Sequence, residues 1–261
     1  TTGKINTNAV TNAKLAQMTS YTIKANNTGS TADPQDVAFS ALTGLNYWGF
    51  LGNAGTTAGT NFIGTTDAQD LVFKVNNIEH GRIALTSHNI SFGSQTLNSN
   101  VAGDSCIAMG YQSLFSNTLG NSNISLGGQS MYTNTGGTRN IAIGSQTLFA
   151  NLTGNDNVSV GHNAMIDNQT GDKNVAIGFE SLLNNTSGSN NSILGYGAMT
   201  SNLVGGNNTA IGYLAMASNI ASSNTAIGAQ SLPSNTTGIN NTAIGTIAGI
   251  AVTTGSNNTA L

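Results

Sequence analysis

The stretch Asn240-Asn241-Thr242-Ala243-Ile244-Gly245 is one copy of a motif that repeats through the last two thirds of the chain. Its glycine occurs ten times, and eight of the nine intervals between successive glycines are seventeen residues long. A fixed period of this length is typical of solenoids, in which each unit is stable only when stacked on its neighbours. The period predicts an all-β chain in which residues 89–261 form a parallel β-solenoid of 17-residue repeats. The marker glycines are Gly93, Gly110, Gly127, Gly144, Gly161, Gly178, Gly195, Gly212, Gly228 and Gly245.

Positions within a repeat are counted here from its marker glycine. Position −1 is large and apolar in every repeat, from Phe92 to Ile244, and we expect it to form a continuous internal column. A second apolar column stands at +4, from Leu97 to Leu232, and Gly249 breaks it in the last repeat. Position −2 is Ala or Ser except at Ile193. Because neighbouring strand residues face opposite sides, we expect these small side chains to face outward, where a partner chain approaches closely.

Position −4 is asparagine in every repeat except one, where Cys106 replaces it. A column of identical amides predicts hydrogen bonds up and down the stack, and it places Cys106 as a buried, neutral thiol. The single sixteen-residue interval, between Gly212 and Gly228, lacks one residue between Asn219 and Asn224. A deletion within a strand would turn every later side chain to the wrong face, so we expect a turn to absorb it.

Composition narrows the possible functions. Only 7% of the residues are charged, and none is charged from Ser181 to Leu261. The net charge of −3 and the seven scattered basic residues leave no basic patch, which disfavours nucleic acid as a partner. No apolar run approaches the ~20 residues that span a bilayer, and no signal peptide opens the chain. Because Thr1 is not methionine and Leu261 falls one residue before the next expected glycine, we expect a fragment or a processed product.

The residues before the repeats are predicted to form two further segments. Residues 1–60 read as an N-terminal fibre-shaft segment with one short helical run at 11–18. An aromatic cluster of Tyr47, Trp48 and Phe50 favours a hydrophobic plug between modules over a ligand site. Residues 61–88 form a β-hairpin junction, with strands at 71–76 and 81–86 joined by residues 77–80.

The sequence does not assemble an enzyme site, and we expect no catalytic residue, cofactor or metal. His80, His88 and His162 are isolated, without metal-ligand spacing, and are expected on the surface or in turns. Asp156 and Lys173 are one repeat apart, which predicts an ion pair at the rim. A pair of acids suited to glycoside cleavage, Asp167 with Glu180, stays open as a less favoured alternative.

Two aromatic columns are candidate receptor-binding sites. One lies at +1 and the other at +5, and stacking of the repeats would make each an aromatic ladder. Exposed aromatic rings suit a glycan platform, whereas packing inside the roll or between chains is the structural alternative, which we favour. The candidate residues are His162, Phe179, Tyr196 and Tyr213 in the first ladder, and Phe115, Tyr132 and Phe149 in the second.

Three stretches resemble known families. Residues 12–18 (Asn-Ala-Lys-Leu-Ala-Gln-Met) with 22–36 resemble a segment of bacteriophage tail-fibre proteins, and residues 64–85 resemble the module that precedes repeats in such fibres. The Asn-Asn-Thr-Ala-Ile-Gly repeats resemble the head repeats of trimeric autotransporter adhesins and repeat tracts of phage tail fibres. The resemblance implies an elongated homotrimeric fibre in the virion, contacts with other tail proteins, and attachment to a bacterial surface glycan or outer-membrane protein. For the repeats it implies a left-handed parallel roll.

Three alternatives remain beside the tail fibre. The first is a bacterial trimeric adhesin head at the cell surface. The second is an enzymatic tailspike that degrades polysaccharide. The third is a structural spacer without a receptor site.

Overall fold

The computed structural model describes residues 22–25, 35–38 and 63–261, within two separate units that comprise residues 1–63 and 64–261. In the first unit, β1 (Thr22–Ala25) pairs antiparallel with β2 (Gln35–Ala38). The helical run predicted at 11–18 and the aromatic cluster around Trp48 lie outside the described residues.

The second unit begins with the predicted hairpin. Strands β3 (Leu71–Val75) and β4 (Ile78–Ile83) pair antiparallel with a bulge after Phe73. The turn is two residues, Asn76 and Asn77, both in the left-handed region at φ 49° and 59°, and is therefore shorter than predicted. Because β4 also pairs antiparallel with β5, the hairpin covers the first edge of the solenoid sheet.

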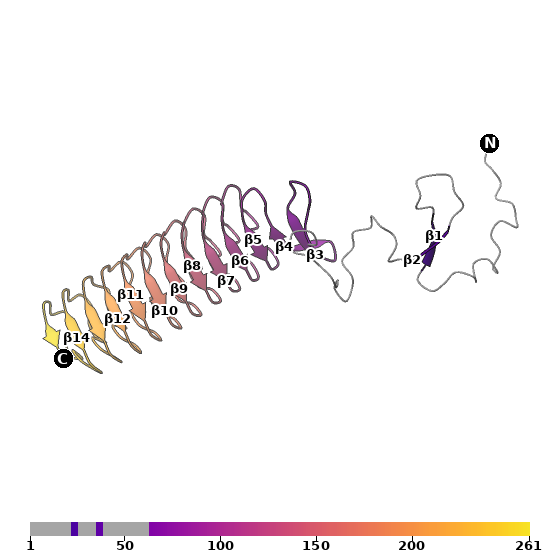
Figure 1. Cartoon of the computed structure of the whole chain (residues 1–261). Helices are drawn as coiled ribbons and strands as arrows, with labels where there is room; N and C mark the ends of the chain where they lie inside the picture. Colours follow the sequence, from indigo (N-terminus) through magenta and orange to yellow (C-terminus); the bar gives the residue numbers. More distant parts are fainter. Residues whose placement is uncertain (1–21, 26–34, 39–62) are drawn as a thin grey trace. The chain divides into compact units, whose positions relative to one another are not determined.

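The solenoid consists of eleven short strands, each paired in parallel with the next (Figure 1), and this confirms the predicted fold class. Successive strands keep the same register throughout, so equivalent positions of neighbouring repeats stand directly above one another. The strands are β5 (Ile90–Phe92), β6 (Ile107–Met109), β7 (Ile124–Leu126), β8 (Ile141–Ile143), β9 (Val158–Val160), β10 (Val175–Ile177), β11 (Ser192–Leu194), β12 (Thr209–Ile211), β13 (Thr225–Ile227), β14 (Thr242–Ile244) and β15 (Thr259–Ala260).

The inside and outside of the strands are the reverse of our expectation. The small residues at −2, such as Ala142, are fully buried against the +4 column, whose members Leu114 to Met216 are also fully buried. The −1 column, predicted to be internal, faces outward, with Ile143 40% exposed and Leu194 48% exposed. The prediction was wrong because the chain segment across the core leaves room for one large side chain per repeat. Leu or Met at +4 fills most of that space, and the residue opposite it at −2 is small in every repeat except one, where Ile193 is buried as well.

Marker glycines allow this close approach of neighbouring turns. At Gly144 the backbone has φ 136°, and a Cβ atom there would collide with the carbonyl oxygen of Gly161. At the glycine column neighbouring turns are in direct backbone contact. The stacking of the other columns depends on this short distance between turns.

Two asparagine ladders connect the turns. In the predicted −4 ladder, Asn157 donates from Nδ2 to the carbonyl oxygen of Gly171 (2.8 Å), and its Oδ1 accepts the backbone N–H of Asn174 (2.9 Å). A second ladder at +7 was not predicted: Asn134 Nδ2 donates to Asn117 Oδ1 at 2.7 Å, and Asn151 repeats the bond to Asn134. Both ladders are buried, so they satisfy backbone and side-chain groups that no water reaches.

The sixteen-residue repeat confirms that a turn absorbs the missing residue. Strand β13 remains in register with β12, with Ala226 beside Ala210. The local cost falls on the +7 ladder, because Asn219 Nδ2 donates to Ala221 of its own turn at 2.8 Å rather than to Asn202. The core position +4 is unaffected, since Met216 is fully buried.

Candidate functional site

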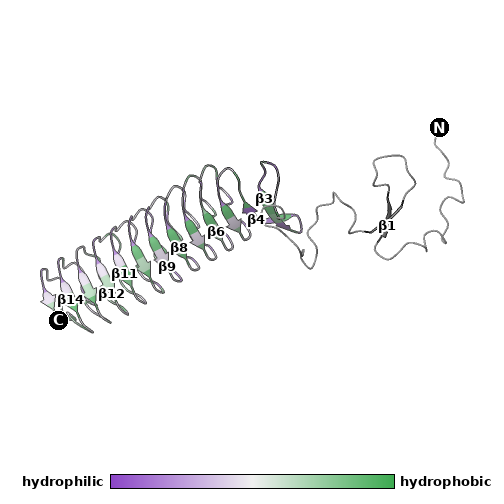
Figure 2. Cartoon of the chain, in the orientation of Figure 1, coloured by the Kyte–Doolittle hydropathy of each residue, from purple (hydrophilic) through white to green (hydrophobic). Residues whose placement is uncertain are grey.

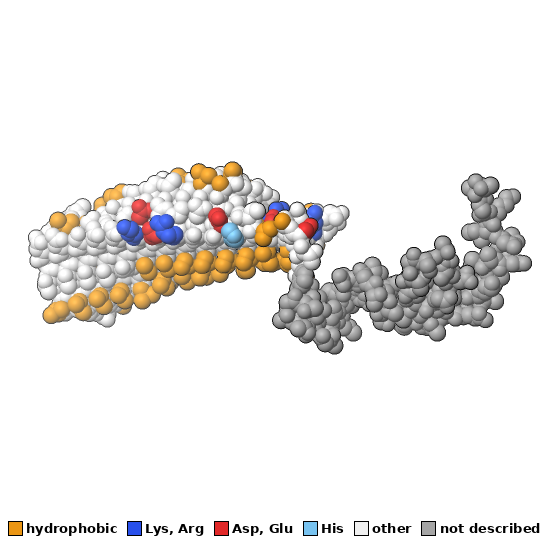
Figure 3. Space-filling model, turned by 45° about the horizontal axis from the view of Figure 1, so that its top comes forward, with side chains coloured by type: hydrophobic (Ala, Val, Ile, Leu, Met, Phe, Trp, Pro, Cys, Tyr) orange, Lys and Arg blue, Asp and Glu red, His pale blue; other side chains and the backbone are white. Residues whose placement is uncertain are grey.

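An exposed apolar stripe follows the outer face of the solenoid sheet, and we call the side chains at −3 and −1 of β5 to β14 the outer band. Figure 3 shows it as a continuous orange stripe along the molecule, below the charged side chains. Both columns are apolar from β5 to β10, but from β11 onward the −3 column carries Ser or Thr while −1 stays apolar. The colour of the strands weakens accordingly toward the C-terminus in Figure 2. The −3 residues are Ile90, Ile107, Ile124, Ile141, Val158, Val175, Ser192, Thr209, Thr225 and Thr242.

The first aromatic ladder lies at +1, two residues beyond the −1 column of the outer band. Phe179 and Tyr196 stack with ring centroids 5.1 Å apart, and Tyr196 stacks on Tyr213 at 5.5 Å. His162 meets Phe179 edge-on at 5.6 Å. Tyr196 and Tyr213 are 50% and 52% exposed. The predicted ladder therefore forms, and it stands on the surface rather than inside the roll.

The second ladder lies at +5, directly after the buried +4 residue, on the turn segment that follows each strand. Phe115, Tyr132 and Phe149 stack at 5.1 Å with interplanar angles of 8° and 5°. All three rings are half-buried. This ladder also forms as predicted, and less of its surface reaches solvent than in the first.

Ring stacking limits what either ladder can bind. A sugar that stacks on an aromatic side chain needs a free ring face. At centroid distances of 5.1 to 5.5 Å the neighbouring rings cover each other's faces, so internal rings present edges and, for tyrosine, hydroxyl groups. Tyr213 ends the first ladder, because the +1 residue of the next repeat is Ala229. The geometry therefore favours hydrogen bonding to the phenol hydroxyls, with one free ring face at Tyr213.

Charges gather at the rim of the central repeats, but not as predicted. Asp156 pairs with Arg139 of the preceding repeat, at 2.6 Å from Nε to Oδ1, and not with Lys173. The guanidinium group lowers the pKa of Asp156 and the carboxylate raises that of Arg139. Arg139 has two N–H groups aligned with both carboxylate oxygens, which the single ammonium of Lys173 does not offer.

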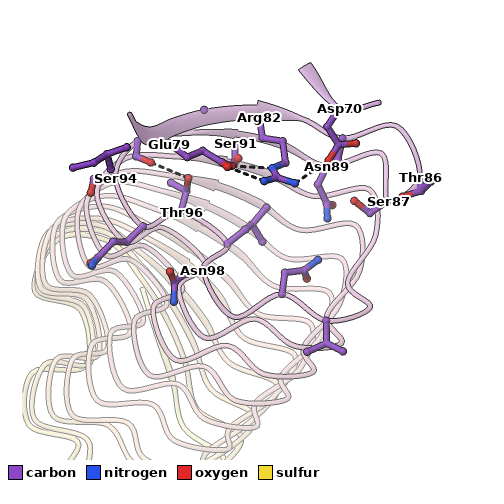
Figure 4. A pocket seen from close by; sticks show the side chains of 18 residues that line it. Asp70, Glu79, Arg82, Thr86, Ser87, Asn89, Ser91, Ser94, Thr96 and Asn98 are labelled. Carbon is purple, nitrogen blue, oxygen red and sulfur yellow. Dashed lines mark hydrogen bonds and ion pairs between the residues drawn. The ribbon is translucent and has the colours of Figure 1, made fainter. Parts of the chain in front are cut away.

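A cavity of about 810 Å³ opens at the first repeat, where the hairpin covers only the sheet side (Figure 4). Arg82 lies at its wall and forms ion pairs with Asp70 (2.9 Å) and Glu79 (2.7 Å). The pKa of Asp70 is lowered, first by the backbone N–H of Leu85 and then by Arg82. The pKa of Glu79 is lowered by its hydrogen bond to Arg82. Both carboxylates are therefore stabilised in their ionised form by their neighbours.

The remaining candidate groups form no reactive cluster. Burial raises the pKa of the Cys106 thiol, whose Sγ lies 3.4 Å from the carbonyl oxygen of Gly120, so the predicted buried, neutral thiol is confirmed. His88 is exposed and lies 3.1 Å from Asp104, so it is less isolated than predicted. Asp167 occupies +6 of one repeat and Glu180 occupies +2 of the next. In the repeat numbering the buried +4 position separates these two positions.

Within residues 63–261 and the two short strands before them, no group of three or more His, Cys, Asp or Glu side chains is placed to hold a metal ion. The same part of the chain contains no helix long and apolar enough to cross a membrane.

Sequence reasoning missed the outer band, the cavity and the second asparagine ladder. The ladder had a readable signal, because asparagine recurs at +7 from Asn100 to Asn235. The outer band had one too, since small residues at −2 alternate with large ones at −1, but its direction was assigned the wrong way.

Comparison with known proteins does not identify a family: no protein family, no curated protein and no solved structure matches the chain.

Proposed function

We propose that the chain is part of a bacteriophage tail fibre, which assembles as a homotrimer and attaches to a bacterial surface glycan or outer-membrane protein. The observation that carries this proposal is the outer band on a rigid solenoid. A fibre needs a stiff rod with a surface on which its subunits associate, and the parallel stack with its continuous apolar stripe offers both.

The rest of the surface suits contact with a polar receptor. Charged residues are absent from Ser181 to Leu261, so attachment by this part relies on hydroxyl, amide and aromatic groups. Two of the four residues of the first aromatic ladder, Tyr196 and Tyr213, belong to this region, and both of these tyrosines are about half exposed. Three copies of one weak site on a rigid rod raise avidity without a tight single site.

Sequence resemblance supports the same assignment. The segments at 12–36 and 64–85 resemble tail-fibre segments, and the repeats resemble those of phage fibres and trimeric adhesins. The adhesin head is the second candidate, favoured by the parallel repeat solenoid itself. An enzymatic tailspike has less support, because its candidate acids, Asp167 and Glu180, occupy different positions, +6 and +2, of successive repeats and do not line the cavity.

Binding of the purified oligomer to a bacterial glycan array and to intact host cells tests attachment. We expect Tyr196→Phe with Tyr213→Phe to weaken binding, since the variant keeps the stacked rings and removes both hydroxyl groups. Tyr111→Phe is the matched control, because Tyr111 occupies +1 of an earlier repeat, outside the ladder, and is 55% exposed. A separate variant, Tyr132→Phe, tests the second ladder.

Absence of binding to every cell and glycan, with the oligomer intact, would favour the structural spacer. Shortened glycan products after incubation would favour the tailspike. Equal binding by the ladder variant and the parent would remove the first ladder from the receptor site.

A further inference from the structure

The +1 column contains a gap before the first aromatic ladder begins. Between Tyr111 and His162, the two intervening repeats carry Gly128 and Ser145 at +1. Apart from the chain neighbours of Gly128, a Cβ atom at this glycine would meet one heavy atom within 4 Å, the hydroxyl oxygen of Ser145 at 3.9 Å. The space beside Gly128 is therefore open. We call the gap at Gly128 and Ser145 the notch.

The ring of Tyr111 borders the notch with an uncovered face. Tyr111 is 55% exposed, and no other aromatic ring in the described part of the second unit stacks on it. The +1 residues of the repeats on either side are Ser94 and Gly128, neither of which carries a ring. Because successive repeats keep the same register, a ring beside Gly128 would stand against Tyr111 as Tyr196 stands against Phe179, at 5.1 Å.

The notch is wider than one flat ring. Tyr111 and His162 are three repeats apart, which is roughly 14 Å at a strand spacing of about 4.8 Å. In the first aromatic ladder each flat ring fills the height of one repeat. A sugar ring is puckered and saturated, and is therefore thicker than an aromatic ring. Two repeats without a side chain larger than serine leave room for a sugar ring with one face on Tyr111.

Polar groups lie beside the open ring face. The exposed hydroxyl of Ser145 donates to the carbonyl oxygen of Gly128 at 3.3 Å and keeps its lone pairs as acceptors. Gln129 follows Gly128, and its amide bonds to Gln112 at 3.1 Å and to Gln146 at 3.4 Å. These two bonds use one N–H and one lone pair of the Gln129 amide and leave the others available. The +1 and +2 positions of these three repeats carry no charge, which favours an uncharged ligand.

We infer that the notch binds one uncharged sugar ring of a bacterial surface glycan, with an apolar face of the sugar on Tyr111 and its hydroxyl groups toward Ser145 and Gln129. This inference rests on the proposed attachment function and deepens it, because it names the class of receptor and assigns a contact outside the first aromatic ladder. An aromatic side chain of a protein receptor would also cover Tyr111, but it would leave one repeat of the notch empty and the polar groups without partners.

A tyrosine at Gly128 tests the notch by filling it. In Gly128→Tyr the new ring completes a stack on Tyr111, and the backbone tolerates it because Gly128 lies outside the left-handed region and has space for a Cβ atom. Ala229→Tyr is the matched control, since it adds the same side chain at +1 beyond Tyr213 and leaves the notch open. A second pair of variants separates ring from hydroxyl: Tyr111→Ala removes the stacking face, whereas Tyr111→Phe keeps it.

Binding of glucose, galactose, mannose and N-acetylglucosamine to the purified oligomer is measured by saturation-transfer NMR, beside the glycan array. An aromatic stacking contact is worth a factor of roughly 2–12 in affinity. We expect Gly128→Tyr and Tyr111→Ala to weaken sugar binding by at least this factor, and Ala229→Tyr and Tyr111→Phe to bind as the parent does. Circular dichroism checks that each variant keeps the fold of the parent.

Equal sugar binding by the parent and by folded Gly128→Tyr and Tyr111→Ala would overturn the inference. Loss of binding in Ala229→Tyr alone would overturn it too, and would place the sugar on Tyr213. A parent that binds no sugar also overturns the notch, but its attachment to host cells would leave the proposed function standing with a protein receptor. Sugar binding that depends on Tyr111, without attachment to any cell, would refute the attachment function and support the notch.

Discussion

Replacing Cys106 with asparagine should stabilise the solenoid, because it completes the −4 ladder. In the other repeats the amide at this position joins two turns, as Asn157 does through Gly171 and Asn174. Cys106 provides only a weak S–H group, with Sγ 3.4 Å from the carbonyl oxygen of Gly120. The glycine carbonyl that accepts the amide elsewhere is supplied here by Gly120, and the Cys106 thiol already contacts it, so the new amide group should reach it.

The magnitude follows from the bonds gained. Cys106→Asn adds an amide donor toward Gly120 and an oxygen acceptor for the backbone N–H of Asn123. Each such bond contributes about 0.5–1.5 kcal/mol net, so two contribute about 1–3 kcal/mol. The weak contacts of the thiol are lost in exchange, and we expect a gain of about 1–2 kcal/mol, equal to a factor of roughly 5–30 in a local opening equilibrium.

Native-state hydrogen exchange is the suitable assay, because a solenoid opens locally and a single melting temperature averages over its repeats. Protection of the amides in residues 106–123 should rise by that factor in Cys106→Asn. The reverse change, Asn157→Cys, should lower protection in residues 157–174 by a similar factor. Cys106→Ala controls for simple loss of the thiol. Lower or unchanged protection in Cys106→Asn, with an unchanged circular dichroism spectrum, would refute the account of the ladder.

Three further predictions address the core, the glycine column and the cap. Leu148→Ala should destabilise the fold by about 2–5 kcal/mol, whereas Ile143→Ala in the outer band should change unfolding of the monomer little and weaken self-association; denaturation at low concentration and sedimentation separate the two effects. Gly144→Ala should prevent correct stacking, whereas Gly245→Ala, with φ 128° but no atom closer than 3.8 Å to the new Cβ, should cost only backbone strain, as measured by soluble yield and thermal unfolding. The pKa of Asp70 is lowered from 3.8, so its contribution to the stability of the hairpin is present above that pH and is lost as the pH falls through the lower folded value. Hydrogen exchange should therefore show the hairpin loosening in acid. Residues 181–261 carry no charge and should keep their protection.

The period of the sequence was sufficient to predict the stack, because equivalent residues in a solenoid occupy equivalent places. The +4 core column and the −4 asparagine ladder followed directly, and the short repeat was assigned to a turn for a physical reason that the structure confirms. The hairpin was predicted, but its first strand was taken one residue too long and its second strand was placed three residues too late, at 81–86 instead of Ile78–Ile83.

The facing of the strands could not be obtained from hydrophobicity alone. A strand has two faces, and the larger apolar residues normally occupy the buried one. Here Ala or Ser at −2 faces inward because Leu or Met at +4 already fills the interior, so volume across the core decides the direction. Comparing the side-chain volumes at −2 and +4 within each repeat would have indicated which face of the strand is buried.

The left-handed backbone positions of the repeat could not be predicted from the sequence either. In most repeats three non-glycine positions, at +2, +4 and +12, adopt left-handed φ values, as Gln112 (56°), Leu114 (51°) and Ser122 (56°) show. Glutamine and leucine carry no signature of this conformation, which costs roughly 1–3 kcal/mol per residue. The cost is offset by hydrogen bonds between turns, such as Leu114 N–H to the carbonyl oxygen of Ser130 (3.0 Å), which exist only in the stack.

The reversed facing changes what stabilises this chain. From β5 to β10, two of the three large apolar columns, at −3 and −1, lie outside the interior and are only partly buried, so each of their side chains contributes less to folding of the single chain than the fully buried +4 residue. Folding of one copy instead relies on backbone bonds between turns, the two amide ladders and one large side chain per repeat. In the assembly proposed above, association would bury the outer band, and a chain with polar side chains in that band should fold as this one does and remain monomeric. Different columns of the same seventeen-residue repeat therefore set the stability of the single solenoid and the stability of the proposed assembly.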